Sequence, residues 1–182
     1  MLNQNGKVRV FSTFSGIGGF EKGITAAIGE KAEFIAYSEI DKYAIKVYEK
    51  QFPGVKNYGD ITRIKAEELP DFDCLVGGVP CQAWSIAGKR GGFSDDRGNM
   101  WWHFIRILKA KKPTYFVAEN VKGLLSHDKG RSFEILCEAF CEAGYVIDFE
   151  LLNSKNFGVP QNRERVYLIG VREDAIKPEY VI

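Results

Sequence analysis

Short apolar runs alternate with longer amphipathic segments along this chain. KVRVFSTF (7–14) and FDCLVGG (72–78) are apolar runs typical of buried strands, whereas NMWWHFIRILKAKK (99–112) carries its apolar positions at helical spacing. The pattern predicts strands over residues 7–14, 32–39, 55–60, 72–78, 114–120, 145–153 and 165–171. It predicts helices over residues 17–28, 41–52, 62–70, 99–112 and 132–144, and irregular structure over 172–182.

This alternation predicts an α/β fold with a doubly wound, mostly parallel, seven-stranded sheet and helices on both faces. The last two strands are separated by SKNFGVPQNRE (154–164) and no helix, so we expect an antiparallel pair at one edge. No internal repeat or linker interrupts the pattern, and we therefore expect one domain over residues 1–182.

Composition narrows the class of protein. The chain has 182 residues, 45% hydrophobic and 27% charged, which is ordinary for a globular protein. No apolar run reaches the roughly 20 residues of a membrane span, and the N-terminus has no signal pattern. Its four cysteines fit neither a disulfide framework nor a zinc motif. We therefore expect a cytoplasmic protein without metal or membrane attachment.

The net charge of +1 does not indicate a nucleic-acid binder, but the local charge changes the picture. Residues 83–112 hold seven Lys/Arg against two Asp. Two interpretations stay open at this point: a solvated face, or a surface that contacts phosphates.

Three polar features follow the first three predicted strands. FSGIGGFEKG (14–23) clusters glycines after the first strand, although a dinucleotide fingerprint would need glycine at position 21, which is Glu21. Glu39 ends the second strand and suits the hydroxyls of a ribose, and Asp60 ends the third and could accept from an adenine amino group. A tight turn and helix caps are the alternatives. Together the three features favour an adenosine-bearing cofactor.

GGVPCQAWS (77–85) presents a cysteine at the end of the fourth predicted strand. A nucleophilic cysteine needs thiolate character, since a free thiol has a pKa of about 8.5, and Lys89 and Arg90 follow in the next loop. Glu119 ends the apolar run YFVAE (115–119). Desolvation there would raise the pKa of Glu119 and make it a proton donor beside Cys81.

These motifs resemble those of DNA (cytosine-5)-methyltransferases of the bacterial restriction-modification type. The resemblance covers residues 8–172, and its motifs are FSGIGGFEKG (14–23), SEID (38–41), GDI (59–61), PCQAWS (80–85), SIAGKRGGF (85–93), ENV (119–121) and QNRERVYLIG (161–170). It implies the Rossmann-like fold of class I methyltransferases. It also implies S-adenosylmethionine as methyl donor, S-adenosylhomocysteine as product, and duplex DNA as substrate at the nucleoid.

The resemblance assigns a role to each matched residue. The catalytic group would comprise Cys81, Gln82, Glu119, Asn120, Arg163 and Arg165. The cofactor would contact Phe14, Ser15, Gly16, Gly18, Gly19, Glu39, Ile40, Asp60, Ile61 and Pro80. DNA would contact Ser85, Lys89, Arg90, Arg97, Arg163 and Arg165. A structural salt bridge is the alternative for Arg163.

The implied reaction is covalent. The Cys81 thiolate adds to carbon 6 of a flipped cytosine, which makes carbon 5 nucleophilic, while Glu119 protonates ring nitrogen 3. Carbon 5 then takes the methyl group and loses its proton to a base that the sequence does not identify. The glycines of residues 83–98 would let this loop close over the base.

Family members continue with a target-recognition region and C-terminal motifs, which we do not find before Ile182. A truncation, one subunit of a split enzyme and an inactive remnant are the three alternatives. We expect a second polypeptide to supply the missing parts, and an apolar face to be exposed where it binds. A transfer-RNA cytosine-5 methyltransferase and a non-catalytic binding module remain rival functions.

Overall fold

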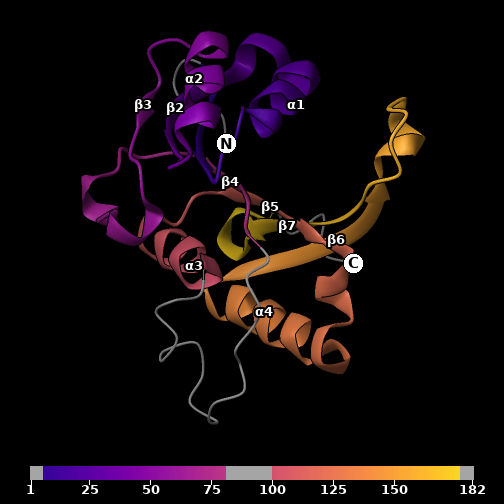
Figure 1. Ribbon diagram of the computed structural model, residues 1–182. Helices are drawn as coiled ribbons and strands as arrows, with labels where there is room; N and C mark the ends of the chain where they lie inside the picture. The colour runs from indigo at the N-terminus through magenta and orange to yellow at the C-terminus, as the bar shows by residue number, and fades with distance from the viewer. Residues whose placement is uncertain (1–5, 81–99, 177–182) are drawn as a thin grey trace.

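The computed structural model describes residues 6–80 and 100–176 (Figure 1). Its strands are β1 (Val8–Thr13), β2 (Ala32–Ser38), β3 (Lys56–Asn57), β4 (Cys74–Gly78), β5 (Tyr115–Val121), β6 (Tyr145–Asn153) and β7 (Glu164–Arg172). Its α-helices are α1 (Gly19–Ile28), α2 (Lys42–Gln51), α3 (Met100–Lys111) and α4 (Arg131–Glu142). The elements follow the predicted order along the chain.

The strands form one seven-stranded sheet in the order β3-β2-β1-β4-β5-β7-β6. β1 to β5 are parallel where they pair, while β7 runs antiparallel to both β5 and β6. The predicted doubly wound sheet with an antiparallel edge is therefore confirmed. Because Thr13 pairs with Gly77 and Gly78 pairs with Glu119, the carboxyl ends of β1, β4 and β5 lie side by side.

Local signals set the helix ends. The Asp41 carboxylate accepts hydrogen bonds from the backbone N–H groups of Tyr43 and Ala44, and it thereby caps the start of α2. Helix α4 ends before Gly144, whose φ of 85° is the left-handed conformation expected at that position.

The helix predicted over residues 62–70 is wrong. Two short 3-10 turns, Ile61–Arg63 and Ala66–Glu68, occupy that stretch instead. Each segment is too short to repay the cost of nucleating an α-helix, and Pro70 prevents extension.

Helices α3 and α4 cover one face of the sheet, opposite to α1 and α2 (Figure 1). Phe116 of β5 stacks on Phe140 of α4 with ring centroids 4.4 Å apart, and Phe104 of α3 meets both rings edge-on. This aromatic cluster packs both helices against β5, and it thereby holds the strand whose carboxyl end carries Glu119 and Asn120.

The other face is covered in part. Helix α1 packs Phe20 and Ile24 against Val10, Cys74 and Val76. Further along the sheet, Tyr115, Val146 and Ile169 remain 39%, 51% and 50% exposed. An exposed apolar face was expected, and the described residues carry one. Within residues 6–80 and 100–176, no helix is long and apolar enough to cross a bilayer.

Gly170→Ala tests the packing of β7 on the aromatic cluster. A Cβ at Gly170 would overlap the ring of its cross-strand partner Phe116, which Phe140 holds from behind. We expect the free energy of unfolding in denaturant to fall by about 1 to 3 kcal/mol. Gly123→Ala is the control, since its Cβ would meet its nearest neighbour at 3.9 Å. Equal stability of the two variants would contradict this packing.

Candidate active site

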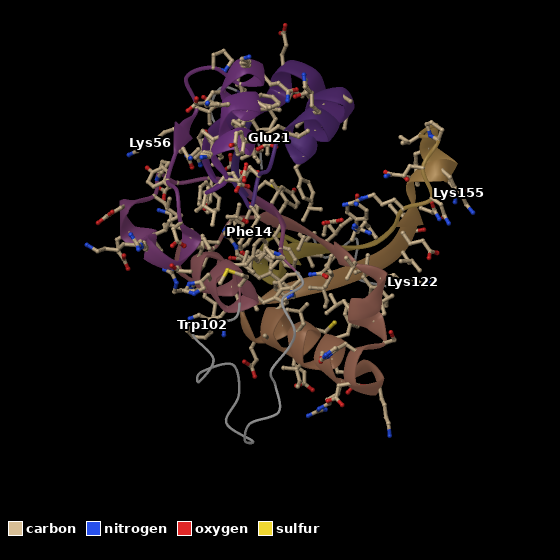
Figure 2. The ribbon with its side chains drawn as sticks, viewed as in Figure 1. Phe14, Glu21, Lys56, Trp102, Lys122 and Lys155 are labelled. Carbon is tan, nitrogen blue, oxygen red and sulfur yellow. The ribbon has the colours of Figure 1, made fainter. Side chains whose placement is uncertain are left out.

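The loop after β1 has an unusual backbone. Phe14, Gly16 and Gly18 have φ values of 51°, 54° and 93°. A side chain in this left-handed region costs roughly 1 to 2 kcal/mol, and such residues cluster at ligand sites. Phe14 lies near the centre of the molecule, below α1 and α2 (Figure 2). The loop therefore makes a tight left-handed turn, and contact between its backbone and a cofactor stays a prediction.

Glu39 ties this loop to the end of β2. One carboxylate oxygen accepts from the backbone N–H of Gly16 at 2.8 Å, and the other accepts from Ile40 and Asp41 at 2.8 and 2.9 Å. A carboxylate offers more lone-pair sites than these three bonds use, so hydroxyl donors of a ligand can still bind it. Glu39 thus both builds the strand edge and presents an acceptor there.

The remaining predicted cofactor contacts, Ile40, Asp60 and Ile61, differ in what they can offer a ligand. The Asp60 carboxylate accepts from the Thr62 N–H at 2.9 Å and caps the first 3-10 turn, and these bonds with Thr62 lower the pKa of Asp60. The capping alternative is therefore realised. Ile61 is buried in the core, so its backbone is what it can offer a ligand, whereas Ile40 is 72% exposed.

Asn120 anchors the end of β4. Its side-chain N–H donates to the Val79 carbonyl at 2.9 Å, and the residue is buried. Val79 precedes the exposed Pro80, the last described residue before position 81. Asn120 therefore fixes where the chain leaves the sheet on its way to Cys81. Cys81, Gln82, Ser85, Lys89, Arg90 and Arg97 lie outside the described residues.

Glu119 is the centre of a charged cluster. Its Oε1 pairs with Arg165 Nε at 2.7 Å, and Arg163 approaches the same oxygen to 3.9 Å. Its Oε2 faces β4, because a Cβ built on Gly78 would come within 3.2 Å of it. The carboxylate of Glu119 is thus ion-paired. The sequence predicted apolar surroundings for it and did not indicate these arginine partners. A salt bridge for Arg163, left open above, is present.

A cleft of about 850 Å³ joins these features. Its carboxyl end is lined by Phe14, Ser15, Gly19, Gly78, Glu119, Arg163 and Tyr167. Its other end is apolar and lined by α1 and the starts of β1, β4 and β5. The loop after β1 and the Glu119 cluster therefore share one cavity. Glu39, Ile40, Asp60 and Ile61 lie outside its lining, at the ends of β2 and β3.

Tyr167 was missed from the sequence. Burial raises its pKa, and the charge of Glu119 raises it further, against the lowering effect of Arg163 and Arg165. The sequence did contain a signal for Tyr167: Arg165 and Tyr167 lie two residues apart in the predicted strand 165–171 and therefore share a face, and Arg163 lies two residues before Arg165. In the part of the chain that the structure describes, no three His, Cys, Asp or Glu side chains could hold a metal ion.

The chain matches the family model for the C-5 cytosine-specific DNA methylase over residues 8–181. The orphan methyltransferase M.SPRI of Bacillus phage SPR is 53% identical over 180 residues, which cover 96% of this chain and 40% of that protein. The type II methyltransferase M1.ScrFI of Lactococcus lactis subsp. cremoris is 45% identical over 170 residues, covering 93% and 43%. This chain thus spans about two fifths of these curated relatives.

Solved structures agree on the fold. A putative DNA modification methyltransferase encoded within an E. coli prophage superposes with a TM-score of 0.75 at 27% identity, over 95% of this chain and 50% of that one. The Dnmt2 methyltransferase of S. pombe gives a TM-score of 0.77 at 22% identity, over 96% and 53%.

Proposed function

This chain belongs to the C-5 cytosine-specific DNA methylase family, and we propose on that premise that it is the catalytic and cofactor-binding domain of such an enzyme. It would transfer a methyl group from S-adenosylmethionine to carbon 5 of cytosine in duplex DNA. The observation that carries the proposal is the shared cleft, which joins the loop after β1 to Glu119 and Arg163.

The described residues fit the cofactor. The loop after β1 lines the cleft with Phe14, Ser15 and Gly19, and the space around Gly16 is open, since nothing lies within 4 Å of a Cβ built there. Glu39 would accept from ribose hydroxyls, while the Asp60 carboxylate and the Ile61 backbone would meet the adenine. S-adenosylmethionine supplies an electrophilic methyl group when bound.

Cys81 would be the nucleophile, as Pro80 is placed at the exit of β4 beside Glu119. Its thiolate forms a carbon–sulfur bond at carbon 6 of cytosine, and the electrons of the 5,6 double bond move into the ring. Glu119 in its protonated form donates its proton to ring nitrogen 3 as charge develops there, and it takes the proton back when the thiolate departs. After carbon 5 gains its methyl group, its proton leaves to a base, the double bond returns and the thiolate departs.

The two arginines would orient this acid. Arg165 occupies Oε1 of Glu119, which leaves Oε2 facing the exit of β4. Arg163 is half exposed and reaches the cleft, so it can contact the flipped base or its phosphate.

The DNA-facing side would extend along the β6–β7 hairpin. Figure 1 shows this hairpin projecting from the body, and Figure 2 shows Lys122 and Lys155 on that side of the molecule. Ser85, Lys89, Arg90 and Arg97 remain predicted phosphate contacts. A location at the bacterial nucleoid in the cytoplasm follows from this substrate.

A further polypeptide segment would cover the apolar face. The cleft has an apolar end, and Tyr115, Val146 and Ile169 leave apolar side chains exposed on the same face of β5, β6 and β7. Exposed apolar surface of this kind marks a binding site for another segment. The curated relatives are more than twice as long as the matched region. We assign the target-recognition function to such a partner.

Cofactor binding is tested by calorimetric titration with S-adenosylhomocysteine. The Glu39→Ala, Asp60→Ala double variant should bind at least about tenfold more weakly than the wild type, since hydrogen bonds to charged groups contribute about 1.5 to 3 kcal/mol each. Glu49→Ala, an exposed carboxyl on α2, should leave affinity unchanged. Full retention of binding in a folded double variant would remove this assignment.

The substrate is tested with labelled S-adenosylmethionine. We expect label in duplex DNA when a partner chain carrying the target-recognition region is added, and little site-specific transfer without it. Transfer to RNA alone would favour the transfer-RNA enzyme, and no transfer at all would favour a non-catalytic module. Robust site-specific methylation by the isolated chain would show that the partner is unnecessary.

A further inference from the structure

Glu21 is a buried carboxyl that the proposed reaction does not use. It lies in the first turn of α1, two residues after the glycine loop, and none of its surface is exposed. Figure 2 places it within the layer formed by α1 and α2. Its Oε1 accepts a hydrogen bond from the Tyr48 hydroxyl of α2 at 2.8 Å. A buried carboxyl in a surface-type helix needs a reason, because burying it is costly.

Tyr48 contacts the glycine loop as well as Glu21. A Cβ built on Gly18 would meet the Tyr48 ring at 3.4 Å and the Phe52 ring at 2.6 Å, so the loop backbone lies directly on α2. The Tyr48 ring also stacks on Tyr37 of β2 at 3.9 Å. The hydroxyl of Tyr48 therefore fixes the helix that follows the loop, while its ring supports the loop itself.

Helix α2 also connects the loop to Glu39. The Gln51 side chain donates to the Ile17 carbonyl at 2.7 Å, near the C-terminal end of α2. At the other end, α2 begins directly after the segment whose N–H groups bind Glu39. One short helix thus touches both parts of the cofactor site.

We propose that Glu21 and Tyr48 are positioning residues, which hold α1 on α2 and thereby keep residues 15–19 in the conformation that receives the cofactor. The proposal rests on the function proposed above. Neither residue contacts the cofactor in this account; both act through the loop backbone.

The buried carboxyl of Glu21 makes the contribution of the Glu21–Tyr48 pair to stability depend on pH. Burial raises the pKa of Glu21, and the hydrogen bond from the Tyr48 hydroxyl opposes part of that rise. The groups that face Glu21 are Tyr48 from α2 and Ser12 from β1, with Tyr37 of β2 stacked behind Tyr48 and Lys22 next to Glu21 on α1. Burial also raises the pKa values of Tyr37 and Tyr48, so both hydroxyls stay protonated through the neutral range.

The sign of the pH effect follows from this direction. The folded protein binds the Glu21 proton more tightly than the unfolded chain does. The stability this confers is complete below the ordinary glutamate pKa of 4.5 and is lost as the pH rises through the folded value. Glu21→Gln keeps an acceptor for Tyr48 and cannot titrate. Its melting temperature relative to the wild type should therefore increase with pH.

Tyr48→Phe and Tyr37→Phe form the matched test. Tyr48→Phe removes the hydrogen bond and keeps the ring, while Tyr37→Phe removes a hydroxyl for which the described residues offer no hydrogen-bond partner. Two readouts are measured: the dissociation constant of S-adenosylhomocysteine, and amide hydrogen exchange of residues 15–19 without ligand. For Tyr48→Phe we expect about tenfold weaker binding and faster exchange, because the variant leaves Oε1 of Glu21 as a buried acceptor without its donor. Tyr37→Phe should change both less than twofold.

Three results would overturn the proposal. If Tyr48→Phe shows the amide exchange of the wild type at residues 15–19, Glu21 and Tyr48 only pack the two helices and do not position the loop. This test needs no ligand, so its result stands even if the wild type binds no cofactor and the proposed function fails. Parallel melting curves of Glu21→Gln and wild type across pH would remove the role of the buried carboxyl. If Tyr48→Phe does not fold, Gln51→Ala at its partly buried position decides, and unchanged amide exchange at residues 15–19 in that variant would contradict support of the loop by α2.

Discussion

Two adjacent glycines at the end of β4 determine how close the neighbouring strands can bring their polar side chains. A Cβ at Gly77 would collide with the hydroxyl of Thr13, and one at Gly78 would crowd Oε2 of Glu119. Because both positions lack a side chain, Thr13 from β1 donates to the Val76 carbonyl at 3.1 Å, and Glu119 from β5 reaches the exit of β4. The polar end of the cleft lies where these three parallel strands end together.

The remaining contacts preserve that arrangement. Arg165, held on β7 by antiparallel pairing with β5, turns Glu119 by binding one of its oxygens. Asn120 fixes the last described turn before Cys81 from the opposite side of β5. Glu39 and α2 do the same for the loop after β1. These contacts, which lie mostly outside the cleft, thereby fix Glu119, the end of β4 and the loop after β1 relative to one another.

Much of the architecture was readable from the sequence because the strand pattern is local. Alternating apolar runs and amphipathic segments predicted the order of elements, and the short link between β6 and β7 predicted their antiparallel pairing. The same pattern placed Glu119 beside the end of β4, which the register confirms. The 3-10 turns after Asp60 were misread as a helix, since capping and proline outweigh weak helical spacing in a stretch this short.

Long-range side-chain contacts were not readable. Glu21 has the pattern of a solvent-facing helix residue, and its burial depends on where α2 crosses α1. The ion pairs of Glu119 depend on β7 adding to the sheet next to β5, far along the chain. The apolar outer face of β5 and β7 was expected from a family resemblance, and alternation alone would not have indicated it.

The proposed function requires Cys81 to perform covalent chemistry on cytosine. The most direct measurement is mass spectrometry of the chain, with a complementing partner and S-adenosylmethionine, after incubation with duplex DNA that carries 5-fluorocytosine at the target. Fluorine replaces the proton that must leave carbon 5, so we expect a stable methylated adduct on Cys81, absent in Cys81→Ala. An adduct that persists in Cys81→Ala, or its absence from a complemented wild type that methylates ordinary DNA, would contradict the account.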